Sequence, residues 1–248
     1  MNVVDSTRHL SRETIDSYYK FGYVVIPSLL SKSYIDRLMR ANNNPNSEKK
    51  EWNGAGLNAS KPNEDLSIHQ ILVHPTILNL AEEYLEQPVR VHFGIFAIIA
   101  ANGGNGLPWH QDNMYTKLLG RAMNIFIALC DITPEMGTLW IAPKSHVHGV
   151  LDYQTNTTTA PGHREVTEAP KDSLCIGTLK KGDVVVFDRQ TLHRSLTNSS
   201  PSDRYAYAAQ FSSENIRNAE DGMVMREKIL ARDLLATYLK SDSYIQPK

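Results

Sequence analysis

The sequence predicts a mainly β protein with flanking helices, whose core is a double-sheet jelly roll of about eight strands. Between residue 89 and about residue 212, short β-branched and aromatic runs are separated by turn-forming residues. Outside that region, apolar residues recur at helical spacing. For 248 residues we expect one domain, with 1–88 as helical N-terminal support, 89–212 as the jelly-roll core and 213–248 as a C-terminal helix.

Four elements are expected before the core: a helix from Ser11, a strand over 21–27, a helix from about residue 31 to about 41 and a helix over about 75–86. Ser11 is a favourable N-cap, and Ile15 and Tyr18 follow it at the spacing of one helix face. Residues 46–66 are polar and contain two glycines and a proline. They indicate a surface loop that could serve as a lid over a site.

Within the core, strands are predicted over 89–100, 122–130, 138–142, 183–187, 192–196 and 204–211. A last helix is expected over about 223–240, because Met225, Ile229 and Leu234 lie at helical spacing.

Net charge and the distribution of apolar residues indicate which binding partners to expect. The 26 basic and 27 acidic residues give a formal net charge of -1, so we expect no nucleic-acid or anionic-membrane partner. A small-molecule partner fits better. The N-terminal residues lack a basic region followed by an apolar stretch, and no apolar run approaches the roughly 18 residues of a membrane helix. We therefore expect a cytoplasmic protein, and no feature predicts its oligomeric state.

The first chemical motif is the segment Trp109-His110-Gln111-Asp112. On a strand, alternation puts His110 and Asp112 on one face and turns Gln111 away. One imidazole and one carboxylate on the same face suit a borderline divalent metal and leave coordination positions to fill. Alone, the motif is equally compatible with a surface pair that hydrogen-bonds to the chain.

A second motif adds a histidine and an arginine. Residues 198–203 are dense in turn formers and lie between two strand-like runs. A hairpin centred between residues 198 and 199 would place His193 opposite Arg204, with Ser195 on the same face as His193.

Together, His110, Asp112 and His193 form a two-histidine, one-carboxylate set that suits non-haem iron(II). The charges of iron(II), one carboxylate and Arg204 sum to plus two. A dicarboxylate such as 2-oxoglutarate neutralises this sum if one end chelates iron and the guanidinium binds the other. Ser195 could donate a further hydrogen bond to that distal carboxylate.

Five motifs follow one another along the chain: His110-x-Asp112, Asp131–Gly137, Pro143–His146, Gly182-Asp183, and His193 with Ser195 and Arg204. This order resembles the phytanoyl-CoA dioxygenase family of jelly-roll oxygenases. The resemblance covers about residues 90–211, and residues 21–27 are similar to the family's opening segment.

The resemblance implies a double-stranded β-helix, a cupin-like jelly roll, that uses iron(II), 2-oxoglutarate and O2. It implies the same three metal ligands and the same contacts to the distal carboxylate. Asn124 and Phe126 lie in a segment that resembles the cosubstrate-contacting strand of relatives, with Phe126 in place of a tryptophan. Lys144 replaces a glycine that is usual in the family, which leaves the local turn in doubt.

Asp112 bears on the reaction type. Relatives that halogenate have glycine or alanine at this position, so the resemblance implies an enzyme that hydroxylates or otherwise transfers oxygen. 2-Oxoglutarate would be converted to succinate and CO2 while a substrate C–H bond is oxidised. Desaturation, demethylation and ring chemistry start from the same oxidant.

Two other classes of protein stay open. A cupin-type metalloprotein, such as an isomerase or hydrolase with zinc or manganese, would bind metal without producing succinate, and it leaves Arg204 unexplained. A binding protein that has kept the fold and lost the chemistry is the other class.

The substrate is expected to be a small polar natural product or an amino-acid-like molecule. Its candidate contacts are Trp109, Tyr115, Lys117, Trp140 and the loop 46–66. Six further histidines are expected to be structural or surface residues: His69, His74, His92, His146, His148 and His163.

Overall fold

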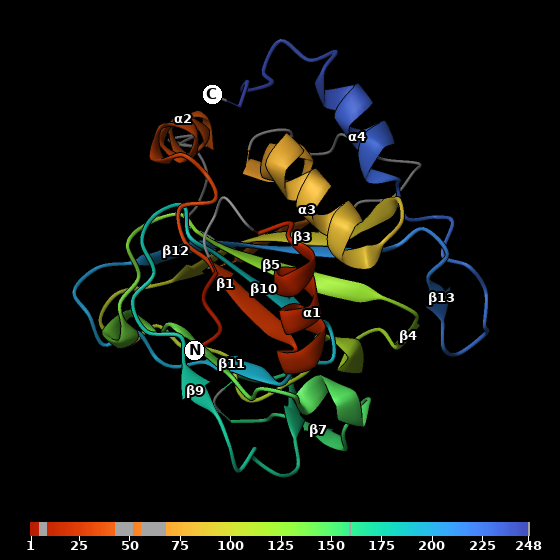
Figure 1. The fold of residues 1–248 in the computed structure, drawn as a ribbon. Coiled ribbons are helices and arrows are strands. Elements are labelled where there is room, and N and C mark those ends of the chain that lie inside the picture. The colour runs from red at the N-terminus through yellow and green to blue at the C-terminus, as the bar shows by residue number, and fades with distance from the viewer. Residues whose placement is uncertain (5–8, 43–51, 56–67, 159, 248) are drawn as a thin grey trace.

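A computed structural model describes residues 1–4, 9–42, 52–55, 68–158 and 160–247 (Figure 1). A six-stranded antiparallel sheet crosses the middle of the molecule, and a three-stranded sheet faces it. Helices α2, α3 and α4 lie on the side of the large sheet that is opposite the small sheet (Figure 1). The predicted fold class, a mainly β jelly roll with flanking helices, is confirmed.

The α-helices of the described chain are α1 (Arg12–Phe21), α2 (Lys32–Asn42), α3 (Pro75–Leu85) and α4 (Ala231–Tyr238). The short 3-10 helices are η1 (Ile68–Val73), η2 (Asp112–Met114), η3 (Pro134–Met136) and η4 (Ser145–His148). The strands are β1 (Tyr23–Ile26), β2 (Trp52–Ala55), β3 (Val89–Ile99), β4 (Leu118–Leu119), β5 (Ala122–Ala128), β6 (Leu139–Ile141), β7 (Tyr153–Thr155), β8 (Arg164–Val166), β9 (Leu174–Cys175), β10 (Val184–Asp188), β11 (His193–Ser195), β12 (Arg204–Ser213) and β13 (Arg217–Asn218).

The large sheet has the order β1-β10-β5-β12-β3-β2, and its two faces have different partners. Strand β5 illustrates the division, because Ile125 and Ile127 pack in the cluster that contains the helices. Phe126 and Ala128, which alternate with them, pack toward the small sheet β11-β6-β9. Side chains on a strand alternate between faces, so one apolar run supplies both layers.

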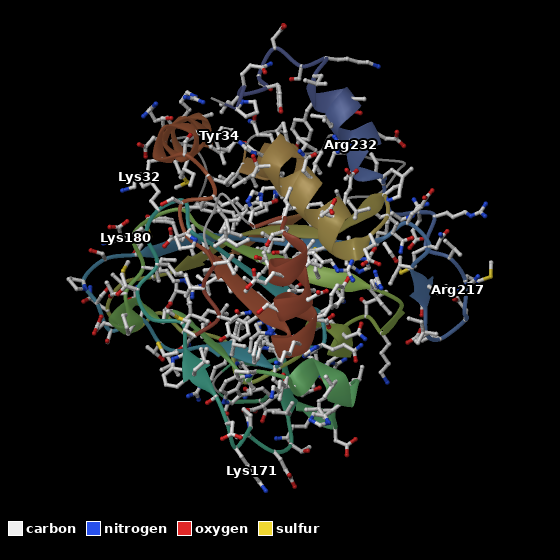
Figure 2. The ribbon with its side chains drawn as sticks, viewed as in Figure 1. Lys32, Tyr34, Lys171, Lys180, Arg217 and Arg232 are labelled. Atoms are coloured by element: carbon white, nitrogen blue, oxygen red, sulfur yellow. The ribbon has the colours of Figure 1, made fainter. Side chains whose placement is uncertain are left out.

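The helical side of the molecule forms where the helix signals predicted it. Ser11 caps α1 by accepting a hydrogen bond from the backbone of Thr14. At the other side, Arg232 of α4 donates from Nε to Glu82 of α3 at 2.8 Å. Figure 2 shows Arg232 and Tyr34 on this helical side, with Lys171 at the opposite end of the molecule.

The predicted hairpin between His193 and Arg204 is wrong. In the structure β11 pairs with β6, so that His193 lies opposite Ile141. Arg204 begins β12, which pairs with β3 and β5, and lies opposite Ile99. The turn between them therefore carries the chain from the small sheet to the large one.

Two boundaries also differ from the predictions. The last helix occupies 231–238 and not 223–240, because Ile229 accepts a backbone hydrogen bond from Val91 of β3 and Leu230 forms a bridge with Arg90. Phe21 ends α1 instead of starting a strand, since Gly22 terminates the helix with φ 80°.

The predicted lid 46–66 lies mostly outside the described residues. Its residues 52–55 form β2, which pairs with the edge of β3. No helix of the described chain has the length and apolar character needed to cross a membrane.

Candidate active site

A cavity of about 450 Å³ lies between the two sheets. Strands β3, β5 and β12 of the large sheet form one wall, and β6 and β11 of the small sheet contribute to the other. The segment that leads into η2 contributes His110 and Asp112 to the same cavity. The three residues predicted as metal ligands and Arg204 therefore share one interior space.

Three metal-ligating side chains meet in this cavity. One potential ligand atom from each of His110, Asp112 and His193 lies within 4.8 Å of the others. The Nε2 atom of His110 is 3.8 Å from one carboxylate oxygen of Asp112, and Nε2 of His193 is 4.0 Å from the other. The two histidines are joined by backbone hydrogen bonds of 3.0 Å in both directions, which bring the two distant motifs together.

The predicted alternation of side chains along the first motif also holds for Gln111, the residue between His110 and Asp112. Gln111 is fully buried and points away from the cavity, as alternation predicts. Its side-chain nitrogen donates to the backbone of Gly149 and Gln190, and its oxygen accepts from the backbone of Leu151. Gln111 therefore holds the loops around the ligand segment.

Backbone carbonyls orient both imidazole rings. Nδ1 of His110 lies 2.8 Å from the Pro108 carbonyl, and Nδ1 of His193 lies 3.0 Å from the Thr191 carbonyl. Each Nδ1 donates its proton to the carbonyl, which leaves the lone pair of Nε2 for a metal. Burial lowers the pKa of His110 to about 4, so its ring is neutral near pH 7.

Asp112 supplies the negative charge of the group. Burial by itself raises the pKa of this carboxyl, but the nearby histidines, Arg189 and a hydrogen bond from Asn124 bring it below its ordinary value. Two imidazoles and one carboxylate form the ligand set that suits non-haem iron(II) and leaves positions open.

Asn124 and Phe126 lie on the cavity wall along β5. Nδ2 of Asn124 donates to Oδ2 of Asp112 at 2.6 Å, so this residue directly orients a potential metal ligand. Its Oδ1 atom is buried and has no hydrogen-bond partner among the described residues. The ring of Phe126 lies 5.6 Å from the guanidinium carbon of Arg204.

Arg204 is a buried cation without a described acidic partner. Its side chain is 2% exposed, and Nη1 donates to the Gly137 carbonyl at 2.7 Å. Nε is buried without a partner in the described part of the chain, and burial lowers the pKa of the group to about 10. Because a buried charge is costly unless it is paired, this guanidinium fits an anion that enters the cavity.

The residues therefore fit iron(II) with 2-oxoglutarate. The chelating end of the keto acid can reach the metal ligands, and its distal carboxylate can pair with Arg204. Ser195 also lines the cavity, and its Oγ accepts a hydrogen bond from the backbone of Leu107 at 3.0 Å. This leaves its hydroxyl proton available for a carboxylate.

Of the four single residues predicted to contact the substrate, Tyr115 is the one that lines this cavity. Trp109 and Trp140 do not line it but enclose the guanidinium of Arg194, a cavity residue, at 4.8 and 5.0 Å from its central carbon. Trp140 pairs directly with Arg194 across β6 and β11, so both side chains leave the sheet on the same face. Lys117 borders a separate surface hollow, with its amine 5.9 Å from the ring of Tyr153.

Several cavity residues were not predicted from the sequence. His92 and His163, expected to be structural or surface residues, both line the cavity, as do Arg189, Gln210 and Lys228. No spacing rule marks these residues, because their elements are joined only in the folded chain. The structural role expected for other histidines fits His74, which caps α3, and His146, whose ring contacts the Tyr19 carbonyl.

Together, the jelly roll, the two-histidine, one-carboxylate group and the buried arginine of the cavity define the class of iron(II)- and 2-oxoglutarate-dependent oxygenases. The chain matches the family described as Phytanoyl-CoA dioxygenase (PhyH) over residues 18–206, and it belongs to that family. The predicted family is confirmed, and at the level of this family so are iron, 2-oxoglutarate and O2 as cofactors.

Curated relatives match part of the chain. Phytanoyl-CoA dioxygenase domain-containing protein 1 of Danio rerio is 34% identical over 115 residues, which cover 42% of this chain and 38% of the relative. The Bos taurus protein of the same name is 36% identical over 112 residues, with the same coverage. L-proline trans-4-hydroxylase of Streptomyces griseoviridis is 35% identical over 83 residues, covering 32% of this chain and 31% of the relative. The chain thus spans well under half the length of these relatives.

Solved structures share the fold at low sequence identity. EvdO2 of Micromonospora carbonacea var. aurantiaca, complexed with 2-oxoglutarate, has a TM-score of 0.68 at 19% identity and covers 88% of this chain and 97% of its own. The epimerase SnoN, in complex with Fe3+, alpha ketoglutarate and nogalamycin RO, has a TM-score of 0.66 at 18% identity and covers 98% and 94%.

Proposed function

We propose that this protein is an iron(II)- and 2-oxoglutarate-dependent oxygenase that oxidises a C–H bond of a small molecule, by hydroxylation. One observation carries the proposal: the metal-ligating group lines the same cavity as Arg204, a buried cation that forms no ion pair with the residues the structure describes. A metal site alone does not require a second buried charge, whereas a metal that binds a dicarboxylate does.

When bound, iron and 2-oxoglutarate supply the activation of O2 and yield succinate and CO2. The chain's own residues hold and orient these groups. His110, Asp112 and His193 bind the metal, and the Pro108 and Thr191 carbonyls fix the two imidazole rings.

Arg204 sets the direction of the keto acid by pairing with its distal carboxylate, and Ser195 adds a hydrogen bond to that end. Phe126 lies against the guanidinium and excludes water from that pair. A charge pair gains strength when water is excluded, so the buried site favours a single orientation of the keto acid.

A natural-product or amino-acid-like substrate is proposed for the remaining space. The cavity of about 450 Å³ lies within the size range of small-molecule sites. The relative named L-proline trans-4-hydroxylase supports the amino-acid-like substrate, and the neighbour crystallised with nogalamycin RO supports the natural product. Tyr115, with a hydroxyl 3.1 Å from Nδ1 of His163, borders the space where such a molecule would lie.

An anaerobic optical titration tests the cofactor assignment. Iron(II) and 2-oxoglutarate are added to the wild type and to His110→Ala, Arg204→Met and Arg232→Met, and the charge-transfer band of the iron–keto acid chelate is recorded. We expect a band in the wild type, no band in His110→Ala and a weaker keto acid affinity in Arg204→Met. Arg232→Met removes a surface charge near α3 and controls for nonspecific effects of losing an arginine.

The opposite result is equally clear. A folded wild type that gives no band at saturating iron and keto acid would contradict the proposal. Metal binding without any effect of 2-oxoglutarate would instead support a cupin-type isomerase or hydrolase that uses another metal.

A further inference from the structure

A second group of nitrogen donors lies in the cavity, away from Arg204. It consists of His92, Arg189 and Lys228, with the side-chain amide of Gln210 beside them. Along β12, Gln210 lies level with Asn124 of β5, whose amide contacts the metal ligand Asp112. Arg204 begins the same strand six residues earlier. Side chains two apart on a strand share a face, so Arg204 and Gln210 mark two ends of the cavity wall that β12 forms.

A β-bulge turns His92 toward this region. The pairing of β3 with β12 shifts between Gln210 and Phe211, where Gln210 lies opposite Phe93 and Phe211 opposite Val91. The extra residue in β3 is His92, and both His92 and Phe93 line the cavity. A bulge re-aims a side chain that strict alternation would send to the other face.

Lys228 reaches the cavity from the C-terminal segment, which the fold fixes at that place. Nη1 of Arg90 donates to the Lys228 carbonyl at 2.6 Å, and Nε of the same residue donates to the Glu214 carbonyl at 2.8 Å. The adjoining residue Ile229 accepts a backbone hydrogen bond from Val91. The lysine is therefore held against the bulged end of β3.

The donors of this group exceed their acceptors. Nδ1 of His92 and Nε of Arg189 are buried and have no hydrogen-bond partner in the described ranges of the chain. Neither Arg189 nor Lys228 forms an ion pair with a residue that the structure describes. Asp112 and Asp188 raise the pKa of Arg189 through space, and Glu227 raises that of Lys228, but burial lowers both pKa values by more. Two cations and a neutral imidazole facing one cavity form a receptor for an anion.

We propose that His92, Arg189, Gln210 and Lys228 bind a carboxylate or similar anionic group of the organic substrate, at the opposite end of the cavity from Arg204, which is proposed to bind the keto acid. This inference rests on the proposed oxygenase function and narrows its substrate to an anionic small molecule. The apolar walls at Phe93 and Ile95 leave room for the carbon skeleton beside the metal. The alternative ligand for this cluster is the carboxylate by which the keto acid chelates the metal.

Lys228→Met is the informative variant, because it removes one charge and keeps the length of the side chain. Arg189 also donates to the Asp112 backbone at 3.3 Å, so its removal would disturb the metal segment as well. Lys117→Met is the matched control, since Lys117 borders a different hollow. Arg204→Met reports on the keto acid.

The experiment measures binding by calorimetry under anaerobic conditions, on protein that holds iron(II) and 2-oxoglutarate and cannot turn over. The probes are hexanoate, 3-phenylpropanoate and N-acetylproline, each compared with its uncharged carboxamide. We expect at least one carboxylate to bind about tenfold or more tightly than its amide, as a charge-assisted hydrogen bond gives. This preference should vanish in Lys228→Met and persist in Lys117→Met.

Dissociation constants for 2-oxoglutarate, taken from the charge-transfer band, separate the two sources of the anion. The proposal expects weaker keto acid binding in Arg204→Met and unchanged binding in Lys228→Met. Equal losses in both variants would assign the cluster to the keto acid and overturn the proposal. It would also fall if no carboxylate binds more tightly than its amide, or if the preference survives in Lys228→Met. A wild type that forms no band refutes the oxygenase function instead.

Discussion

His110 and His193 obtain their orientation from the residues two positions before them. In both cases Nδ1 contacts the carbonyl of residue i−2, Pro108 in one motif and Thr191 in the other. A short extended segment thus fixes the tautomer of its own ligand. Long-range folding has only to bring the two segments together, which the reciprocal backbone hydrogen bonds between the histidines achieve.

Asn124 should matter for metal affinity although it is not a ligand. Its amide holds Oδ2 of Asp112 at 2.6 Å, and loss of such an outer hydrogen bond lowers metal affinity by about tenfold to a hundredfold. We expect this loss in Asn124→Ala, measured by titration with Mn(II) in the absence of keto acid. Asn79→Ala, at a surface contact with Arg232, is the control. Equal affinities in Asn124→Ala and the wild type would show that Asp112 is oriented without the amide.

At this scale, the sequence predicts residues whose spacing is short or whose chemistry is rare. His110 and Asp112 are two apart. Arg204 was assigned from charge balance, from the family resemblance and from a hairpin register that the structure contradicts, and it nevertheless lines the cavity with His193.

The substrate contacts are harder to predict. The direction of Trp140 depends on which face of the small sheet lines the cavity, and Lys117 lies in a connecting segment whose path depends on the folded chain. His92 could not be found, since its direction depends on a bulge.

Among the elements, β11 and β12 show the limit of predicting partners from turn chemistry. The turn formers between them were recognised, and both strands exist. The chain nevertheless crosses between sheets there, so each strand finds a partner that is distant in sequence. A local pattern specifies where a strand ends, whereas its partner depends on how two sheets close over one core.

The turn before η4 contains a strained lysine. Lys144 has φ 65° at the position where the family resemblance implies a glycine, so the turn keeps a left-handed residue although a lysine occupies it. Lys144→Gly should relieve about 1 kcal/mol of strain, offset by a similar entropic cost in the unfolded chain, and leave stability nearly unchanged. Lys144→Val should lower it by about 1 kcal/mol or more. Urea midpoints measure both, and a Gly variant less stable than the Val variant would contradict this account.

The turn at Gly137 links backbone strain to the anion site. Its φ is 75°, a Cβ there would lie 2.2 Å from the Leu196 carbonyl oxygen, and its own carbonyl accepts from Arg204. Gly177 is a matched control, because its φ is 78° and a Cβ there meets nothing within 4 Å.

We expect Gly177→Ala to cost about 1–2 kcal/mol from backbone strain alone. Gly137→Ala should cost more, because the Leu196 backbone must also move. It should weaken 2-oxoglutarate binding as well, whereas Gly177→Ala should not. Chemical denaturation and the optical titration measure the two effects, and equal behaviour of the two variants would argue against the clash.

For the molecule as a whole, the two faces of the large sheet divide stability from chemistry. One buried cluster joins α1 near Ile15, strands of the large sheet and α4 up to Tyr238, so its members come from both ends and the middle of the chain. The opposite face carries the cavity, where charged groups are buried and several donors have no partner among the described residues. Buried unpaired charge lowers stability, so the helical face offsets what the cavity costs.

That division predicts a large stabilisation by ligands, because metal and keto acid neutralise the charges that the cavity leaves unpaired. A ligand at a hundred times its dissociation constant adds about 2.7 kcal/mol, or about 5–10 °C in midpoint for a chain of this size. We expect Mn(II) to raise the thermal midpoint of the wild type, and 2-oxoglutarate to raise it further only when Mn(II) is present. Arg204→Met should keep the metal increment and lose the keto acid increment, whereas His110→Ala should lose both. An increment from 2-oxoglutarate that survives in Arg204→Met would mean that the buried guanidinium is stabilised by another anion.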